Sequence, residues 1–102
     1  MGNSVPKRLK EARERLGISQ KQLGIKAGID EFSASSRVNH YEKGRHVPNV
    51  DMAERLSKVL GISAAYLFAS NNDIAEVIRL AGKLPSTKRK KLIQDLKKIT
   101  KD

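Results

Sequence analysis

The sequence predicts an all-α fold. Along most of the chain, apolar residues recur every three or four positions, which is the period of an α-helix with one buried face. Glycine, proline and capping residues interrupt this pattern at short intervals, and no segment shows the alternation of apolar and polar residues that is typical of strands. The 102 residues suffice for one small domain with an appendage.

The first two helices are predicted over residues 6–16 and 20–27. Apolar residues at helical spacing mark the first helix, namely Val5, Leu9, Ala12 and Leu16. Pro6 fits the first turn of that helix, and Gly17 ends it. Ser19 caps the second helix, and Gln22, three residues later, completes the pattern of a capping box.

Two glycines shape the second helix. Gly24 lies inside it, where glycine is about 1 kcal/mol less favourable than alanine, so we expect another helix to approach too closely for a side chain. Gly28 follows the helix and suits a turn residue with a left-handed backbone conformation, which few other residues accept. Leu23 and Ala27 are expected to face inward.

A third helix is predicted from residue 34 or 35 to residue 43, and residues 30–33 are interpreted as the connection. Val38 and Tyr41 supply its inward face, and we expect Phe32 to tuck into the core beside them. Short or polar side chains occupy its other faces: Ser35, Ser36, Arg37, Asn39 and His40. Two short helices joined around a glycine are typical of a helix-turn-helix, whose second helix enters the major groove of DNA.

The rest of the chain is predicted to be helical as well. A loop at residues 44–48 leads to a helix over residues 50–60, which Asn49 caps and Gly61 ends. A short helix over residues 64–69 follows the capping Ser63. The polar residues 70–72 divide a DNA-binding domain at residues 1–70 from a tail at residues 71–102. Two apolar stripes around the turn at Pro85 predict that the tail is an αα-hairpin.

The charge of the chain indicates a polyanionic partner. Lys and Arg number 21 against 11 Asp and Glu, which gives a net charge of +10. Nucleic acid is the first expected partner and an anionic membrane the second. No apolar run approaches the roughly 20 residues of a membrane span, and the N-terminal residues lack the apolar region of a signal peptide, so a cytoplasmic protein is expected. Pro6 stands where a myristoylation motif needs Ser or Thr.

Catalytic and metal-dependent functions are not expected. The sequence has no cysteine, which excludes disulfides and thiolate metal sites. Neither His40 nor His46 has another ligand at a metal-binding spacing, and no nucleophile–base pair or phosphate-binding loop is present. We therefore expect no enzyme activity, no metal and no cofactor. RNA binding is a weaker alternative, because only two Phe and two Tyr are available to stack on unpaired bases.

Residues 8–68 resemble the phage-repressor and Cro-type helix-turn-helix domain of the XRE family. The matching pieces are RLKEARERLGISQKQLGIKAGI at residues 8–29, VNHYEKGRHVPNVDMAERLSKVLGIS at residues 38–63 and AAYLF at residues 64–68. The resemblance implies a five-helix, lambda-repressor-like domain that binds double-stranded DNA and regulates transcription as a repressor does. The sequence is about four residues longer than the family pattern between Ile29 and Val38, and we place the extra residues before the third helix.

The resemblance also implies roles for individual residues. Gln20 would contact a phosphate at the N-terminus of the second helix. Arg13 and Glu42 would form a salt bridge between the first and third helices. The remaining residues would meet DNA in three groups: Ser35 and Ser36 at base edges, Arg37, Asn39 and His40 at bases or flanking phosphates, and Arg45, His46 and Asn49 at the sugar–phosphate backbone.

These residue types suit the readout of DNA, but alternatives stay open. Asn can bind adenine and Arg can bind guanine with two hydrogen bonds, and Ser pairs with several bases. Each could instead be a solvated helix residue, and the Lys-rich residues 88–91 could either touch DNA or form a solvated face. One recognition helix covers only a few base pairs, so we expect a homodimer on a two-fold site with half-sites about 34 Å apart.

The surface of that dimer would be the short helix at residues 64–69, the C-terminal helices, or both. The alternative function is an antitoxin or another protein-interaction module. In that case a protein partner would bind the C-terminal helices.

Overall fold

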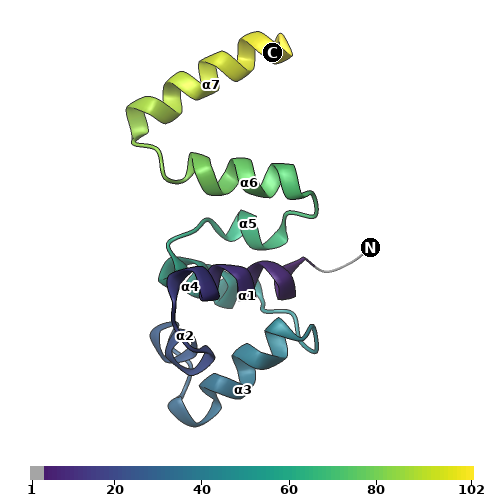
Figure 1. Cartoon of the computed structure of the whole chain (residues 1–102), viewed down its shortest axis with the longest axis vertical. Helices are drawn as coiled ribbons and strands as arrows, with labels where there is room; N and C mark the ends of the chain where they lie inside the picture. The colour runs from purple at the N-terminus through teal and green to yellow at the C-terminus, as the bar shows by residue number, and fades with distance from the viewer. Residues whose placement is uncertain (1–3) are drawn as a thin grey trace.

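The chain folds into seven α-helices without strands over residues 4–102, the part that the computed structural model describes (Figure 1). In chain order the helices are α1 (Val5–Leu16), α2 (Gln20–Lys26), α3 (Glu31–Glu42), α4 (Val50–Leu60), α5 (Ala64–Phe68), α6 (Asn72–Ala81) and α7 (Ser86–Thr100). The predicted all-α fold is confirmed. The first three residues of the predicted 1–70 domain lie outside the described residues.

Side-chain caps fix where α2 and α4 begin. Ser19 Oγ accepts the backbone N–H of Gln22 at 3.0 Å, and the Gln22 side chain accepts the backbone N–H of Ser19 at 2.8 Å. Asn49 Oδ1 accepts the backbone N–H of Met52 at 2.8 Å. Each cap satisfies a donor at a helix end and stabilises the helix by about 1 kcal/mol. The predicted starts of these two helices are confirmed.

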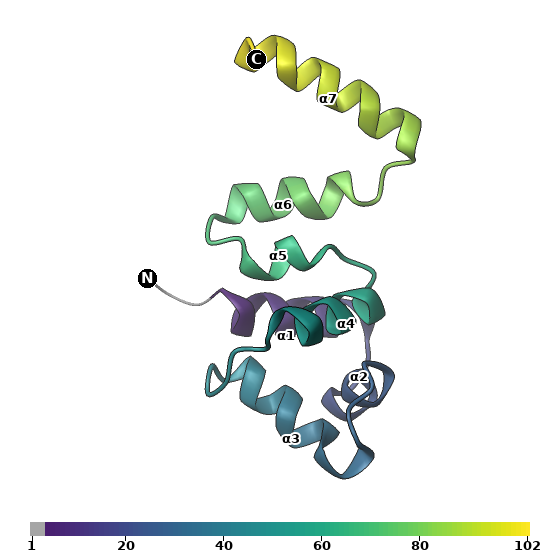
Figure 2. The ribbon, with the colours of Figure 1, turned by 180° about the vertical axis from the view of Figure 1, so that it is seen from behind.

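The core joins the first five helices. Figures 1 and 2 show α2 and α3 at one end of the molecule, α1 and α4 at the middle level, and α5 and α6 beyond them. Leu9, Leu23, Leu56 and Leu67 come from four different helices, and each is wholly buried. Burial of such a side chain contributes about 1.5–3 kcal/mol to the stability of the fold. These contacts therefore hold together the first five helices, α1 to α5, which we call the module.

Gly24 is the point of closest approach between α2 and α3. A Cβ at this position would lie 2.7 Å from Ala34 Cβ and 2.9 Å from both the Cα and the carbonyl oxygen of Ala34. Two helix backbones therefore meet here with no room for a side chain, as the sequence predicts. Gly28, which has a φ of +93°, then turns the chain from α2 toward α3.

The start of α3 differs from the prediction. The helix begins at Glu31, because the Asp30 carboxylate caps it by accepting the backbone N–H of Phe32 at 3.0 Å. The prediction that this helix starts at residue 34 or 35, after a connection at residues 30–33, is therefore wrong, whereas its predicted end at residue 43 lies one residue beyond the observed end. The extra residues relative to the family pattern lie within α3, which begins about one turn earlier than predicted.

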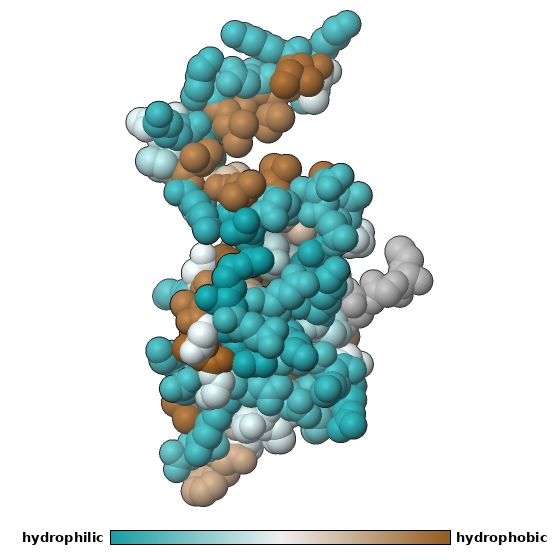
Figure 3. Space-filling model, in the orientation of Figure 1, coloured by the Kyte–Doolittle hydropathy of each residue, from teal (hydrophilic) through white to brown (hydrophobic). Residues whose placement is uncertain are grey.

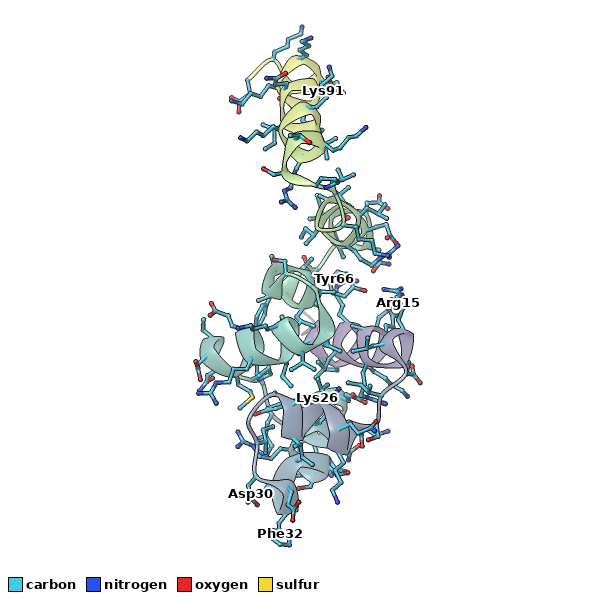
Figure 4. The ribbon with its side chains drawn as sticks, turned by 90° about the vertical axis from the view of Figure 1, so that its left-hand side faces the viewer. Arg15, Lys26, Asp30, Phe32, Tyr66 and Lys91 are labelled. Carbon is cyan, nitrogen blue, oxygen red and sulfur yellow. The ribbon has the colours of Figure 1, made fainter. Side chains whose placement is uncertain are left out.

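The predicted burial of Phe32 is also wrong. Ala34 takes the buried position against Gly24, and a residue two places earlier on an α-helix points about 200° away. Phe32 consequently projects outward, and its side chain is 90% exposed (Figure 4).

Helix α6 packs against the core, whereas α7 does not. Ala75 of α6 is buried. Arg8 of α1 is buried as well: its guanidinium donates to the carbonyl oxygen of Ala69 at 2.7 Å and to Asn72 Oδ1 at 3.2 Å, and it lies 5.5 Å from the ring centre of Tyr66. After a short turn, α7 diverges from α6, and no described residue of α7 is buried (Figures 1 and 2).

None of the described helices is long and apolar enough to cross a bilayer.

Candidate nucleic-acid interface

One face of α3 points away from the core. Ala34, Val38 and Tyr41 are buried, so the residues on the opposite side of this helix face solvent. Four of them follow one another at i, i+4, i+7 and i+11, with a fifth beside them: Phe32, Ser36, Asn39 and Lys43, with His40. We call these five residues the outward stripe. Ser35 and Arg37 lie exposed on its two flanks.

A hydrogen-bonded cluster fixes α3 relative to α1 and α2. Arg13 Nε and Nη2 donate to the two carboxylate oxygens of Glu42 at 2.6 and 3.0 Å, and Arg13 Nη1 donates to the carbonyl oxygen of Ile18 at 3.0 Å. The hydrogen bond to Glu42 raises the pKa of Arg13 above its ordinary value, so the guanidinium keeps its charge. A paired, two-pronged contact of this kind sets the orientation of α3 as well as its attachment.

Gln20 connects this cluster to the outward stripe. Its amide nitrogen donates to Asn39 Oδ1 at 3.2 Å and to Glu42 Oε1 at 3.0 Å. The N-terminus of α2 and the C-terminal half of α3 are thereby joined. Because Asn39 already accepts this bond through its oxygen, its own amide N–H groups are its remaining donors to a ligand.

Cationic side chains surround the cluster. A hollow of about 370 Å³ on this flank of α3 is lined by Lys10, Arg13, Ser19, Gln20, Asn39, Glu42 and Lys43. Since Arg13 is paired with Glu42, the two lysines carry the free positive charge of the hollow. Together with the backbone N–H groups at the start of α2, they suit a phosphate.

The opposite flank of α3 faces the loop before α4. A second hollow of about 370 Å³ is lined there by Arg37, His40, Tyr41, His46, Val47 and Asn49. Arg37 Nη2 donates to the Tyr41 hydroxyl at 3.0 Å, and the rings of His40 and His46 lie 5.1 Å apart. Asn49 uses its oxygen to cap α4, so its amide N–H groups are its remaining donors to a ligand.

The residues predicted to touch DNA therefore divide into three sets. Gln20 and Asn39 meet directly, and a second set gathers around the loop: Arg37, His40, His46 and Asn49. The third set, Ser35, Ser36 and Arg45, is exposed without joining either hollow, and Ser36 Oγ donates to the carbonyl oxygen of Ser33 at 3.2 Å.

Three residues of the interface were not predicted from the sequence to lie there. Lys10 and Lys43 resemble any other surface lysine until the fold brings them beside Gln20. Phe32 joins the stripe because α3 starts early, and the local signal for that start was Asp30, a residue type that favours helix N-caps. Within the described part of the chain, no three His, Asp or Glu side chains are close enough to hold a metal ion.

The chain is similar in sequence and in fold to known transcriptional regulators. A family model described as helix-turn-helix matches residues 9–67. The chain is 32% identical over 68 residues to the HTH-type transcriptional regulator ImmR of Bacillus subtilis (strain 168); the alignment covers 67% of this chain and 50% of ImmR, so the chain spans half the length of that relative. The fold also matches the crystal structure of the transcriptional regulator BswR, with a TM-score of 0.86 and 44% identity over 92% of this chain and 93% of that chain. The matched residues 9–67 include both hollows and the outward stripe.

Proposed function

Because the chain belongs to the XRE-type helix-turn-helix family, we propose that it regulates transcription by binding a two-fold DNA site as a homodimer, in the manner of a repressor. The outward stripe of α3 reads the major groove. The hollows on the two flanks of α3 hold the sugar–phosphate backbone. The protein acts in the cytoplasm, where the DNA of a bacterium or phage is accessible.

The observation that carries this proposal is the placement of short polar donors between two cationic hollows. Base readout needs donors and acceptors on a rigid helix, which Ser36 and Asn39 supply. Phosphate contacts need positive charge or N–H groups on either side of that helix, which Lys10 and Arg37 supply. Contacts with phosphates fix the register of the helix on DNA, and contacts with bases select the sequence.

The homodimer is proposed from the C-terminal helices. Six large apolar residues of α6 and α7 are exposed, namely Ile74, Val77, Leu80, Ile93, Leu96 and Ile99. Figure 3 shows apolar surface on the facing sides of the two helices, in the angle between them. A 15-residue helix is marginally stable in water by itself, so α7 needs a second surface. The same apolar face on a second copy supplies that surface in a two-fold arrangement.

Selection of bound sequences from random DNA duplexes tests the proposal. We expect a short motif with two-fold symmetry and half-sites about one helical turn apart. Asn39→Ala should lose about 1–3 kcal/mol of discrimination at a single position of each half-site. Lys10→Ala should weaken binding by a similar factor on every sequence and lower the salt dependence by about one phosphate contact.

A matched control uses a lysine far from the interface. Lys91 lies on α7, where it pairs with Asp95 at 2.9 Å, and Lys91→Ala should leave the affinity for DNA and its salt dependence unchanged (Figure 4). If the full chain selects no motif, the proposal of sequence-specific binding is wrong. If Asn39→Ala weakens all sequences equally, Asn39 contacts a phosphate instead of a base.

The exposed apolar face of α6 and α7 also favours a second candidate function, a protein-interaction module of the antitoxin kind. In that case the chain alone would be a monomer, and a different protein would cover this face. Sedimentation of the purified chain separates the two functions, because the homodimer requires twice the mass of one chain without any other component.

A further inference from the structure

Phe32 belongs to the same stripe of α3 as the polar residues proposed to meet DNA. Its side chain is 90% exposed, the highest value of any large apolar residue in the described chain. A single exposed apolar side chain is ordinary on a protein surface, so exposure by itself indicates nothing. Its position is informative, because Ser36 and Asn39 follow at i+4 and i+7 on the same side of the helix.

The place of Phe32 along α3 adds a second observation. It is the second residue of the helix, and Figure 4 shows it protruding at the end of the molecule opposite α7, beside Asp30. In helix-turn-helix docking the N-terminal residues of the recognition helix are those that reach base edges. A ring at this position therefore enters the groove ahead of the polar residues.

The charge around Phe32 opposes contact with the DNA backbone. Asp30 and Glu31 come immediately before it, and the Asp30 carboxylate accepts the Phe32 N–H at 3.0 Å. Two carboxylates repel phosphates, whereas the cations of the interface lie further along the helix, at Arg37 and Lys43. Any contact between the first turn of α3 and DNA is therefore expected to come from its uncharged side chains.

We propose that Phe32 packs against the C5-methyl group of a thymine and selects thymine at one position of each half-site. This inference rests on the proposed function. The thymine methyl is the apolar feature of base edges in the major groove, and Phe is one of the side chains that contact it. Burial of one such group strengthens binding about fourfold.

The experiment removes the methyl group and the ring separately. Duplexes carrying the selected motif are prepared with uracil in place of each thymine in turn, which deletes only the methyl. For the unaltered chain we expect one symmetry-related pair of positions at which uracil weakens binding about fourfold per half-site. Phe32→Ala should bind the original duplex more weakly, should be insensitive to uracil at those positions, and should lose the thymine preference in a new selection.

Two controls keep the result interpretable. Phe32→Leu retains an apolar side chain and should keep part of the thymine preference, and Leu16→Ala removes a half-exposed apolar residue of α1 without changing the motif. Since the Phe32 side chain contributes little to the core, Phe32→Ala should keep the helical content and melting temperature of the original chain.

Three outcomes overturn the inference. If the unaltered chain selects no motif, both the proposed function and the role of Phe32 fail. If a motif is selected but uracil has no effect and Phe32→Ala selects the same motif, the function stands and the role of Phe32 fails. If Phe32→Ala leaves DNA binding unchanged and lowers the mass of the assembly instead, Phe32 belongs to a protein interface.

Discussion

The module of α1 to α5 and the last helix, α7, use the same kind of apolar pattern in opposite ways. In α1 and α4, apolar residues at helical spacing are buried, as Leu9 and Leu56 are. In α7 the same spacing leaves Leu96 and Ile99 exposed, and none of the described residues of this helix is buried. The comparison teaches that periodicity predicts which face of a helix is apolar, whereas only the fold decides whether that face is covered within the chain.

If this comparison is right, substitutions in the module change the free energy of unfolding of a single chain, and substitutions in α7 change association. The predictions below descend in their expected effect on that free energy. It is measured by urea denaturation at concentrations where the original chain is monomeric.

The largest effect is expected from Arg13→Ala. This change leaves the Glu42 carboxylate, whose side chain is 2% exposed, with Gln20 as its remaining side-chain donor among the described residues. Loss of one partner from a buried ion pair costs about 3–5 kcal/mol, because the other charge stays buried. Arg13→Met combined with Glu42→Leu removes both charges and should recover most of the loss. An Arg13→Ala chain as stable as the original would show that this pair does not hold α1 to α3.

Gly24→Ala should have the next largest effect, about 1–3 kcal/mol. The new Cβ would lie within 3 Å of backbone and side-chain atoms of Ala34, so α2 and α3 must separate. Lys26→Ala, on the exposed side of the same helix, is the matched control and should change stability by less than about 0.5 kcal/mol. Equal free energies of unfolding for the two variants would contradict the close approach of α2 and α3.

Features of the fold that depend on local sequence could be predicted. The requirement for glycine at position 24 follows from its low helix propensity, and the caps at Ser19 and Asn49 follow from residue type, because both effects are local. The start of α3 could not be predicted in the same way. Asp30 competed with a run of serines that also favour caps, and the contact of Ala34 with Gly24, ten residues away, decided between them.

The candidate interface could be predicted only in part. The polar residues of α3 could be assigned through the family resemblance, and their roles in DNA contact stay predictions. The contact between Gln20 and Asn39 joins residues 19 positions apart, so it depends on the angle between two helices, which no sequence pattern gives. The exposure of Phe32 depends on where α3 begins. Because the predicted start of this helix was wrong, Phe32 was assigned to the core and not to the interface.

A smaller effect, of opposite sign, is expected from Ser57→Ala in the module. Ser57 is 2% exposed, and its hydroxyl has no hydrogen-bond partner among the described residues. A buried hydroxyl without a partner is unfavourable, and alanine is also the better helix former, so we expect stability to rise by about 0.5–1 kcal/mol. Ser57→Val tests the packing around the site, because its extra methyl groups should reverse the gain. A clear loss of stability in Ser57→Ala would mean that the hydroxyl has a partner, such as a bound water.

The smallest effect on the single chain is expected from Leu96→Gln in α7. Leu96 is 43% exposed, and glutamine is nearly as good a helix former, so the free energy of unfolding should stay within about 0.5 kcal/mol. Association should weaken clearly, since an apolar residue of the proposed dimer surface becomes polar. Lys98→Gln lies about 200° round the helix from Leu96 and should leave the sedimenting mass unchanged. If Leu96→Gln destabilised the monomer and left its association unchanged, α7 would be part of the core of its own chain. The contrast between the two regions would then be wrong, because the apolar stripe of α7 would be covered within one molecule, as those of α1 and α4 are.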